Sequence, residues 1–457
     1  MTDLGKLTDR FEGEVVRPED PGYDAARVVW NGMIDRRPAL IVRPRSTDDV
    51  AAAVRFAREE ELVVAVRSGG HSIPGLSTCD GGIVVDLSAM RGAAVDPERR
   101  TARVNGGALL GELDDAAQAF GLVCPVGVVS HTGVAGLTLG GGMGRLQRKL
   151  GLTIDSLLAV ELVIADGRLV RASEEENPDL FWGLRGAGAN FGIATAFEFR
   201  LHPLEREITH GTVIHPADRA EELGDRYREL VETGPDELWA SFGIGLALPA
   251  ESFPPELAGR PIAYVSVLHC GPVADAERDL AGLRGLGRPV VDSVGAKPYL
   301  TTQHLADEAM EWGHRFYMRS AFLPALPDEL VQVWVEHVSR IPKGADGGYS
   351  NWTWGRAIAA VAEEATAFTG RDAAVWTAVE IQWDDPELDD ACREWGRAAI
   401  AEAETYASAG RYVNDVSEVG ADVSRSIYGD AKVERLVALK RAWDPDNVFR
   451  LNQNIKP

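Results

Sequence analysis

The loop at residues 67–75, RSGGHSIPG, directly follows the apolar run of residues 62–66. Paired glycines tolerate positive φ angles, so a backbone of this kind can turn and direct successive N–H groups at an anion. His71 leaves that turn beside whatever the amide groups hold. The loop therefore predicts one of two structures: a tight turn between strands with a surface histidine, or a phosphate cradle with an imidazole next to the bound group.

Short apolar strands alternate with a helix around this loop. Residues 39–42, 62–66 and 82–87 have the composition of strands, and Ser46 can cap a helix that begins just after it. A serine oxygen accepts hydrogen bonds from the free N–H groups at a helix start, and the acidic residues that follow suit the helix dipole. Strand, helix and strand in this spacing predict a βαβ unit.

The composition of the chain changes near residue 206. A chain of 457 residues is too long for one hydrophobic core and predicts about two to three domains. Residues 206–405 mix strands with acidic amphipathic helices and contain eight of the eleven tryptophans. We therefore expect a second, aromatic-lined domain, followed by a return to the first domain after about residue 410.

Acidic residues outnumber basic ones by 70 to 47, which gives a formal net charge of -23. Such a field repels phosphate backbones, so we expect no nucleic-acid partner. The four cysteines lack the spacing of a metal site or of a disulfide framework, and we expect no bound metal. The N-terminal residues lack the apolar core of a signal peptide, and no run approaches a membrane span, so a cytoplasmic protein is the expectation.

A second glycine-dense stretch holds seven glycines between residues 127 and 144, and a third, RGAGANFG, spans residues 185–192. Neither fits the dinucleotide fingerprint GxGxxG, because the last required glycine falls on Arg145 in one and on Phe191 in the other. A nicotinamide-binding Rossmann fold is therefore disfavoured. Dense glycine without that fingerprint indicates either turns and bulges or extended backbone close to a flat ligand, and three such segments in one region favour the ligand.

Four long motifs occur along the chain: RSGGHSIPG, GLTLGGGMGRLQRKLGLTIDSLL, DLFWGLRGAGANFGIAT and WDPDNVFRLNQNIKP. Together they resemble flavoproteins of the vanillyl-alcohol-oxidase superfamily, which have a PCMH-type FAD-binding domain. The most similar branch is that of berberine-bridge-like enzymes and 6-hydroxy-D-nicotine oxidase. The resemblance covers about residues 35–205 and resumes after about 410, whereas the middle of the chain matches loosely. It implies FAD as the cofactor.

The resemblance also implies an α+β fold in two domains. A two-part FAD-binding domain would comprise residues 1–205 and 410–457, with a berberine-bridge-like segment at 443–457. An α+β substrate-binding domain with an antiparallel sheet would be inserted between these parts, at residues 206–409.

In this family the first motif wraps the FAD pyrophosphate, and its histidine, here His71, is bonded covalently to the 8α-methyl group of the flavin. The other residues that the resemblance assigns to the cofactor come from all four motifs and from the sequence RYVND. They are Arg67, Ser68, Gly69, Gly70, Ser72, Gly75, Gly133, Gly136, Gly140, Gly142, Gly144, Gly192, Ile193, Asn414, Asn452 and Asn454.

Some relatives have a second link to the flavin through a cysteine. An alignment on Gly140 places Val129 at that position and Leu137 at the family's next histidine. Cys124 lies five residues too early. This departure predicts a single covalent link; a shifted loop that brings Cys124 or Cys79 to the flavin is the alternative.

In this family the second domain covers the reacting face of the flavin, and two segments resemble its central strands, residues 315–319 with Tyr317 and residues 375–383. Side chains alternate along a strand, so every second residue shares a face. The side chains expected on one face are Trp376, Ala378, Glu380 and Gln382. Glu380 can act as a general base if apolar neighbours raise its pKa; the alternative is that Glu380 and Gln382 face solvent.

The sequence RYVND resembles the family's YxN motif beside the flavin. A tyrosinate at Tyr412 can accept a proton from a substrate hydroxyl, although a tyrosine there can also merely stack. His131 lies where relatives often have another residue, and we interpret it as a loop residue rather than a catalyst. The expected catalytic residues are Tyr412, Glu380, Gln382 and Tyr317.

The expected function is that of an FAD-dependent oxidase with a small-molecule substrate. Hydride would pass to the flavin from a C–H bond next to an alcohol, amine or phenol, and O2 would reoxidise it. Three alternatives stay open: a flavin-dependent cyclase or dehydrogenase for a biosynthetic intermediate, a non-enzymatic flavin-binding protein, and a nicotinamide dehydrogenase. The oligomeric state is also open, with a homodimer as one alternative, and no membrane partner is expected.

Overall fold

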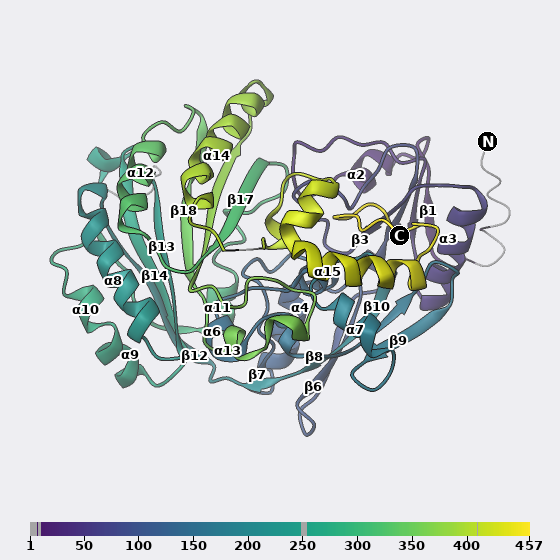
Figure 1. Cartoon of the computed structure of the whole chain (residues 1–457), viewed down its shortest axis with the longest axis horizontal. Coiled ribbons are helices and arrows are strands. Elements are labelled where there is room, and N and C mark those ends of the chain that lie inside the picture. The colour runs from purple at the N-terminus through teal and green to yellow at the C-terminus, as the bar shows by residue number, and fades with distance from the viewer. Residues whose placement is uncertain (1–6, 8–10, 248–253, 409) are drawn as a thin grey trace.

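The computed structural model describes residue 7 and residues 11–247, 254–408 and 410–457. The helices and strands form two groups that lie side by side along the longest axis of the molecule (Figure 1). Within the described residues, one group contains three smaller sheets and the other is built on a single large sheet. This arrangement confirms the predicted α+β fold.

The first sheet carries the loop at residues 67–75. Its strands lie in the order β1 (Glu14–Val16), β2 (Leu40–Arg43), β4 (Ile83–Asp86) and β3 (Val64–Arg67). β4 pairs in parallel with both β2 and β3, and helix α3 (Thr47–Glu59) connects β2 to β3. Ser46 Oγ accepts a hydrogen bond from the Asp49 amide at 3.1 Å, as a helix cap does. The predicted βαβ unit is confirmed, with β4 lying between its two strands.

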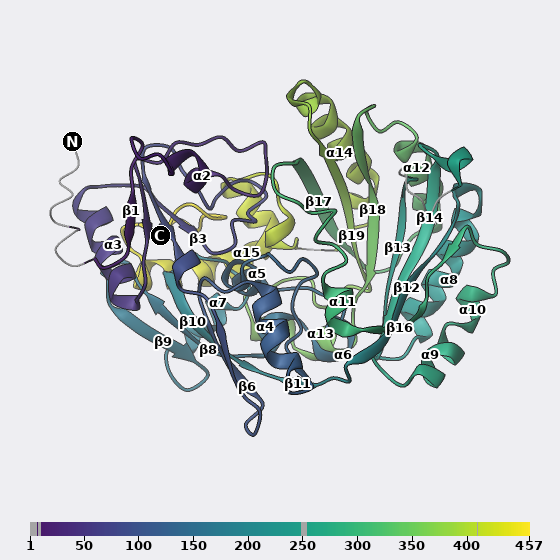
Figure 2. The same cartoon turned by 180° about the vertical axis from the view of Figure 1, so that it is seen from behind.

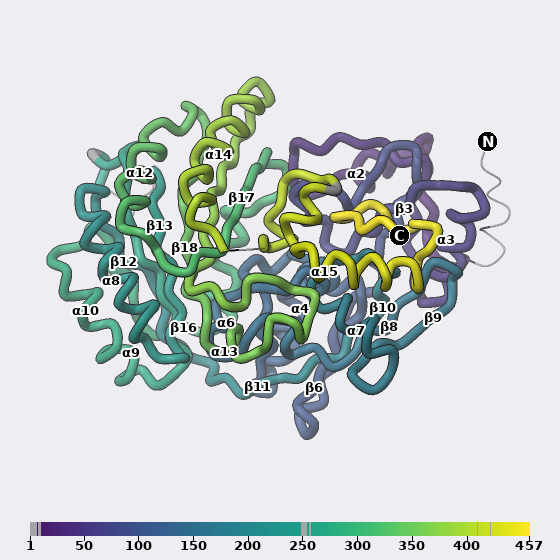
Figure 3. Tube along the Cα trace, viewed as in Figure 1, coloured from purple at the N-terminus to yellow at the C-terminus, as the bar shows by residue number. Residues whose placement is uncertain are grey.

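The second sheet is antiparallel and packs against helices from both ends of the chain. Its order is β5 (Ala93–Asp96), β6 (Thr101–Asn105), β10 (Ile193–Arg200), β8 (Leu157–Val163) and β9 (Leu169–Ser173). Its core includes side chains of α4 (Leu110–Gln118), α5 (Val134–Gly140), α7 (Pro178–Leu184) and α15 (Ala421–Trp443). The C-terminal helix therefore belongs to the same group as the N-terminal strands (Figure 3). A short pair, β7 (Leu122–Val123) and β11 (His202–Pro203), completes this group.

The large sheet has eight antiparallel strands, as predicted for the middle of the chain. Their order is β15 (Val291–Asp292), β12 (Glu207–Pro216), β14 (Pro261–His269), β13 (Leu238–Leu246), β18 (Ala345–Thr353), β19 (Val375–Trp383) and β17 (Arg315–Leu323), with β16 (Gly295–Pro298) also paired to β12. Helices α8 (Ala220–Thr233), α12 (Asp328–Val338) and α14 (Asp389–Glu404) pack their apolar side chains on one face (Figure 2). Shorter helices are α2 (Tyr23–Arg27), α6 (Gln147–Leu150), α9 (Val273–Asp279), α10 (Ala281–Arg284), α11 (Tyr299–Gln303) and α13 (Ala357–Ala360).

The opposite face of the large sheet meets the first group. One apolar cluster combines Ile73 and Met143 of the first group with Phe316 and Trp376 of the sheet. The chain after α14 also protects the edge strand β17, because Ser417 Oγ accepts a hydrogen bond from the Met318 amide at 3.1 Å and donates one to the Met318 carbonyl at 2.8 Å. The junction of the two groups therefore brings together the glycine segments, one face of the large sheet and the C-terminal motifs.

Two buried charges fasten the C-terminal segment. Lys440 Nζ lies 2.7 Å from Asp444 Oδ2, and both side chains are 0% exposed. Lys440 also donates to the carbonyl oxygens of Asn190 at 2.7 Å and Phe449 at 2.8 Å. Asp444 accepts hydrogen bonds from the amides of Val448 and Phe449. The WDPDNVF motif thus folds the end of the chain back onto the segment before β10.

Among the described helices, none combines the length and the hydropathy of a membrane-spanning segment. The described residues also contain no group of three or more histidine, cysteine or carboxylate side chains placed to hold a metal ion. All four cysteines are free thiols, and Cys79, Cys124 and Cys392 are buried.

Candidate active site

The predicted loop at residues 67–75 is anchored at the end of β3. Arg67 forms a buried ion pair with Asp86, with Nη2 and Oδ2 2.6 Å apart. Burial alone would raise the pKa of Asp86, but the adjacent Arg67 guanidinium holds it below its usual range. Gly70 and Gly75 adopt positive φ angles of 74° and 73°, which favour glycine. The loop is therefore a fixed turn, as the glycines predicted.

The first and second glycine segments touch backbone to backbone. A Cβ atom on Gly69 would lie 2.1 Å from the nitrogen of Gly133, and one on Gly133 would lie 2.2 Å from the nitrogen of Gly69. Ser68 Oγ donates to the Gly106 carbonyl at 2.8 Å, and Ser72 Oγ accepts from the amide of Leu76 at 2.9 Å. The close approach of Gly69 and Gly133 joins the two segments into one unit.

Most other predicted glycines allow the protein to pack closely on itself. A Cβ atom would lie 2.2 Å from Asn414 Oδ1 at Gly140, 2.2 Å from Thr153 Oγ1 at Gly142, 1.8 Å from the Val126 oxygen at Gly144 and 2.7 Å from the Val163 oxygen at Gly192. Gly136 differs, because a Cβ atom there would meet no atom within 4 Å. Ile193, next to Gly192, begins β10 and is buried in the core. Of the predicted glycines in helix α5, Gly136 thus leaves free space at the surface.

Tyr412 and Asn414 clamp the C-terminal part of the chain onto the second glycine segment. The Tyr412 hydroxyl accepts hydrogen bonds from the Gly142 amide at 3.1 Å and from Asn414 Nδ2 at 2.9 Å. Asn414 Nδ2 also donates to the Leu137 carbonyl at 3.2 Å. Burial raises the pKa of Tyr412, so its hydroxyl stays protonated at neutral pH. Its proton has no acceptor among the described residues and is free to be donated.

The predicted asparagines at the C-terminus present unpaired acceptors. Asn452 donates to the carbonyls of Ala189 and Phe449, but its Oδ1 atom is buried without a partner in the described residues, as is Oδ1 of Asn454. Unpaired buried acceptors are costly unless a further group bonds to them. The N–H and hydroxyl groups of FAD can supply such donors. The residues present therefore fit FAD. They offer it two unpaired acceptors, the proton of Tyr412 and open space beside Gly136.

His71 is half-buried and enclosed by other rings. Its Nε2 atom lies 2.7 Å from His131 Nδ1. The Trp30 ring stacks on the imidazole at 5.0 Å with an interplanar angle of 18°, and Trp312 meets it edge-on at 6.1 Å. Burial, followed by the neighbouring His131, lowers the pKa of His71 to about 3. His71 is therefore neutral at physiological pH and able to act as a nucleophile.

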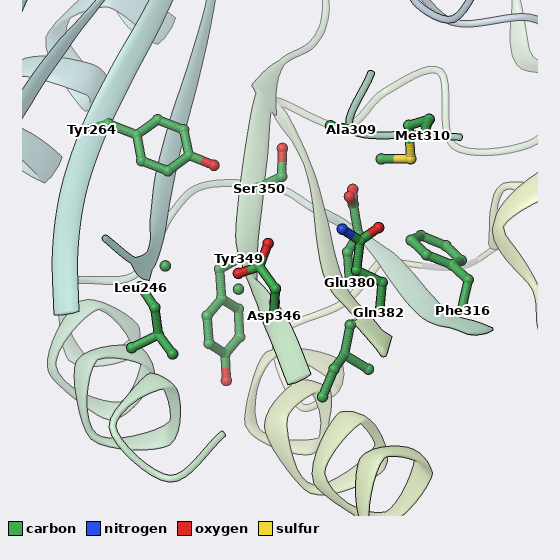
Figure 4. Close-up of a pocket in the computed structure, with 14 residues that line it drawn as sticks. Leu246, Tyr264, Ala309, Met310, Phe316, Asp346, Tyr349, Ser350, Glu380 and Gln382 are labelled. Atoms are coloured by element: carbon green, nitrogen blue, oxygen red, sulfur yellow. The ribbon is translucent and has the colours of Figure 1, made fainter. Parts of the chain in front are cut away.

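A cavity of about 290 Å³ opens on the face of the large sheet that carries no helices (Figure 4). Its walls come from four neighbouring strands, β13, β14, β18 and β19, together with the start of β17 and the loop before it. It is lined by Gly245, Leu246, Tyr264, Ala309, Met310, Phe316, Asp346, Gly347, Gly348, Tyr349, Ser350, Glu380, Ile381 and Gln382. Gly245 pairs with Gly348, and Gly348 pairs with Glu380. The missing side chains at these glycines leave room beside Glu380.

Glu380 and Asp346 bring two carboxyl groups to this cavity. Glu380 has no hydrogen-bond partner among the residues that the structure describes, and no arginine, lysine or histidine lines the cavity. Burial, followed by the negative charge of Asp346, raises the pKa of Glu380 to about 7. Burial also raises the pKa of Asp346. Glu380 can therefore exchange a proton near neutral pH, which is the property of a general base.

The structure separates the other two expected catalytic residues on the strands. Gln382 lines the cavity beside Glu380, as strand alternation predicts. Tyr317 lies on the opposite face of β17, in the core under α14, and its hydroxyl donates to Glu418 Oε1 at 2.6 Å. Its odd position along β17 explains this placement, because the neighbours Phe316 and Met318 face the junction with the first group. Tyr317 does not line the cavity.

Aromatic contacts connect His71 to the cavity. Trp30 stacks on His71 and meets Phe316 edge-on, with 5.0 Å between the ring centroids in each case. Phe316 lines the cavity, and Trp30 Nε1 donates to the carbonyl of Met310, another lining residue, at 2.7 Å. A flat group held at His71 would thus lie next to a small chamber that contains the carboxyl groups of Glu380 and Asp346.

Several residues of this site carry no signal in the sequence. His131 is a loop residue, as expected, but it also bonds to His71. Asp346 and Trp30 occur in segments without a motif, and only the sheet pairing and the loop contacts bring them to the site. Cys124 and Cys79 are each packed in an apolar core.

Comparison with known proteins assigns two segments of the chain to protein families. A family model described as an FAD binding domain matches residues 38–173, and one described as berberine and berberine like matches residues 411–456. The chain is 33% identical to (R)-6-hydroxynicotine oxidase of Paenarthrobacter nicotinovorans, over 98% of this chain and 97% of the relative. It is 31% identical to an FAD-linked oxidoreductase of Dictyostelium discoideum, over 99% and 97%.

Solved structures agree with this result. The crystal structure of 6-hydroxy-D-nicotine oxidase from Arthrobacter nicotinovorans is similar with a TM-score of 0.87 and 32% identity, covering 98% of both chains. Glucooligosaccharide oxidase from Acremonium strictum, at 24% identity, has the same fold with a TM-score of 0.89 and covers 100% of this chain and 99% of its own.

The fold, the two glycine segments and these comparisons define an FAD-linked oxidoreductase with a PCMH-type FAD-binding domain. The chain belongs to the family of berberine-bridge-like FAD-linked oxidoreductases, whose relatives include 6-hydroxy-D-nicotine oxidase. The resemblance of the four motifs is thereby confirmed, and so is the expectation of a flavin-dependent enzyme.

Proposed function

We propose that this protein is an oxidase that binds one FAD covalently through His71 and removes hydrogen from a small alcohol, amine or phenol in the cavity beside Glu380. The observation that carries the proposal is the Glu380 carboxyl group, which faces the cavity, has no hydrogen-bond partner in the described part of the chain and has a pKa near neutrality. The FAD-binding part would comprise residues 1–205 and 410–457, and the substrate-binding part residues 206–409.

Different residues of the cavity would accept the proton, orient the substrate and exclude water. Glu380 accepts the proton of the substrate hydroxyl or amine group, because a base of this pKa is deprotonated in about half the molecules at pH 7. Gln382 and Tyr264 supply amide and hydroxyl groups that orient the substrate. Phe316 and Met310 cover the chamber with apolar surface and exclude water.

The cofactor would be held by the loop amides of residues 67–72, by Tyr412 and Asn414, and by the C-terminal asparagines. When bound, FAD supplies the acceptor for the hydride of the substrate C–H bond. His71 would be its one covalent link, since Val129 stands where some relatives have a second one. The glucooligosaccharide oxidase of similar fold carries a histidyl-linked and cysteinyl-linked FAD, which supports a histidine in this role.

Dioxygen is the proposed final electron acceptor. The support is that relatives 33% and 32% identical to this chain are named oxidases. Hydrogen peroxide should therefore appear in equal amount to the oxidised substrate. A dehydrogenase of the same fold would break that equality. An oxidative cyclase would keep it and would differ in its product, so peroxide measurement and product analysis together separate these functions.

The Glu380→Gln variant tests the assignment of the base. Its kcat should fall roughly a hundredfold or more, because removal of a general base costs on the order of 10²–10⁴. In the unchanged enzyme kcat should rise with pH through about 7 and then level off, since the deprotonated form of Glu380 is the active one. The variant should lose this rise.

The matched control is Glu418→Gln, which makes the same change at a carboxyl group outside the cavity. It should leave both kcat and the pH profile close to those of the unchanged enzyme. An unchanged kcat in Glu380→Gln, or a variant that keeps the rise near pH 7, would contradict the role of Glu380.

A further inference from the structure

His71 and His131 come from different glycine-rich segments and share a hydrogen bond. The bond joins Nε2 of His71 to Nδ1 of His131 over 2.7 Å. In a neutral imidazole one nitrogen is a donor and the other an acceptor. Nδ1 of His71 makes no hydrogen bond to any described residue, so only Nε2 is engaged by the protein. The contact therefore decides which nitrogen of His71 is free.

The surroundings hold both rings in place. Trp30 stacks on His71, and Trp312 closes the side of the ring, which limits its rotation. Ser130, the residue before His131, is fixed by Asp307, which accepts hydrogen bonds from the Ser130 amide at 2.8 Å and from its hydroxyl at 2.6 Å. The pair is thus a built arrangement that the loop before β17 helps to position.

We propose that His131 is the positioning residue for the attachment of His71 to FAD. It keeps the proton of His71 on Nε2, which leaves the lone pair of Nδ1 free to attack the methyl carbon of a bound flavin, and it would accept that proton as the bond forms. This inference rests on the covalent link proposed above.

The atoms and electrons of the attachment balance with dioxygen as the oxidant. A C–N bond forms between the methyl carbon and Nδ1, while one C–H bond of the methyl group and the N–H bond at Nε2 break. Both hydrogens leave as protons, the second of them to His131. Two electrons stay behind on the ring system, and dioxygen takes them up with two protons to give hydrogen peroxide.

A proton acceptor matters at this site because a positive charge on His71 is unfavourable. Burial lowers the pKa of His71 to about 3, so the imidazolium that a simple attack would create is strongly disfavoured. Among the described residues the charge of Asp307 opposes this effect, but its oxygens are already bonded to Ser130 and His304. Transfer of the proton to His131 keeps the positive charge off the His71 ring.

Covalent attachment is measured by acid precipitation and by flavin fluorescence of the denatured chain. The unchanged protein, His71→Ala, His131→Ala and His131→Asn are purified and incubated with FAD over time. His131→Ala should bind flavin but attach it roughly a hundredfold more slowly, the usual cost of losing a proton acceptor. Imidazole added to the buffer should restore part of the rate. His337→Ala, a half-buried histidine on α12, is the control and should behave like the unchanged protein.

His131→Asn separates proton transfer from simple positioning. The asparagine oxygen can occupy the place of Nδ1 and accept the same hydrogen bond, but an amide takes up no proton at neutral pH. Attachment should therefore be slow in this variant too. An unaffected rate in His131→Ala or in His131→Asn overturns the inference while the link itself stands. Flavin that leaves the unchanged protein in acid overturns the covalent link and the role of His131 together.

Discussion

Among the residues with a described position, no cation lies near Glu380 to stabilise a negative charge. Across the two strand pairings its neighbours are Met318 on β17 and Gly348 on β18. The other carboxyl group in the cavity, Asp346, has the same sign and lies two residues before Gly348 on the same strand. The pKa of Glu380 therefore depends on residues of β17, β18 and β19, and a change of charge on β18 should alter it.

The Asp346→Asn variant should lower the pKa of Glu380. Removal of the negative neighbour removes one of the two causes that raise this pKa, so the deprotonated base should be available at lower pH. We expect the rise of kcat with pH to move down by on the order of one pH unit. Asp384→Asn, an exposed carboxylate bonded to His314, is the control and should leave the profile in place. A shift to higher pH would contradict this account.

The face on which Glu380 lies could be predicted from the sequence, because alternation along a strand is local. Its pKa could not, since Asp346 lies on another strand and only the pairing of β18 with β19 brings the two together. The position of Tyr317 relative to the cavity also could not be predicted from the sequence. Its segment was recognised as a strand, but the resemblance did not specify which of the two faces the cavity occupies.

At the scale of elements, two glycines of helix α5 lie in different surroundings, so a side chain is excluded by the protein at only one of them. Gly140, its last residue, stands where a Cβ atom would lie 2.2 Å from Asn414 Oδ1, whereas a Cβ atom at Gly136 would meet nothing within 4 Å. The motif predicted that both glycines approach the cofactor. The structure assigns Gly140 to contact with the chain itself and leaves Gly136 as the one beside open space.

Gly140→Ala and Gly136→Ala should therefore have opposite effects. The first forces Asn414 aside and should lower the free energy of unfolding by about 1–3 kcal/mol, the usual cost of overpacking. The second should keep or raise that free energy by up to about 1 kcal/mol, because alanine is the better helix former, but should reduce the flavin content. Urea unfolding followed by tryptophan fluorescence, together with flavin absorbance, measures both. Equal stabilities would show that the contact with Asn414 is unimportant.

The motif order along the chain was enough to predict the elements around the loop at residues 67–75 and the antiparallel sheet. It was not enough to find the ring enclosure of His71. Trp30 and Trp312 lie far from His71 in sequence, in segments with ordinary composition. Trp30 is placed by backbone hydrogen bonds to Gly70 and Gly313 and by the bond from its Nε1 atom to the Met310 carbonyl, and these long-range partners leave no local pattern in the sequence.

At the scale of the whole molecule, the fully buried pair Lys440–Asp444 joins the C-terminus to the first group of elements. Asp444→Ala would leave the Lys440 ammonium group buried without its partner. We expect the free energy of unfolding to fall by about 3–5 kcal/mol, as for other buried pairs that lose one member. Asp446→Ala is the matched control, because Asp446 is 63% exposed and its bond to Arg58 should contribute about 1 kcal/mol or less. Similar losses in the two variants, measured by thermal or urea unfolding, would contradict the importance of burial here.

The shared core of β10, α15 and Ile455 also has a consequence for synthesis of the protein. The strands of the large sheet all lie between Glu207 and Trp383, so they leave the ribosome before α15 does. Since domains generally fold as units as the chain emerges, the large sheet can form while the first core still lacks its C-terminal helix. The core that contains the earlier strands is thus completed only after the large sheet, when α15 and Ile455 emerge.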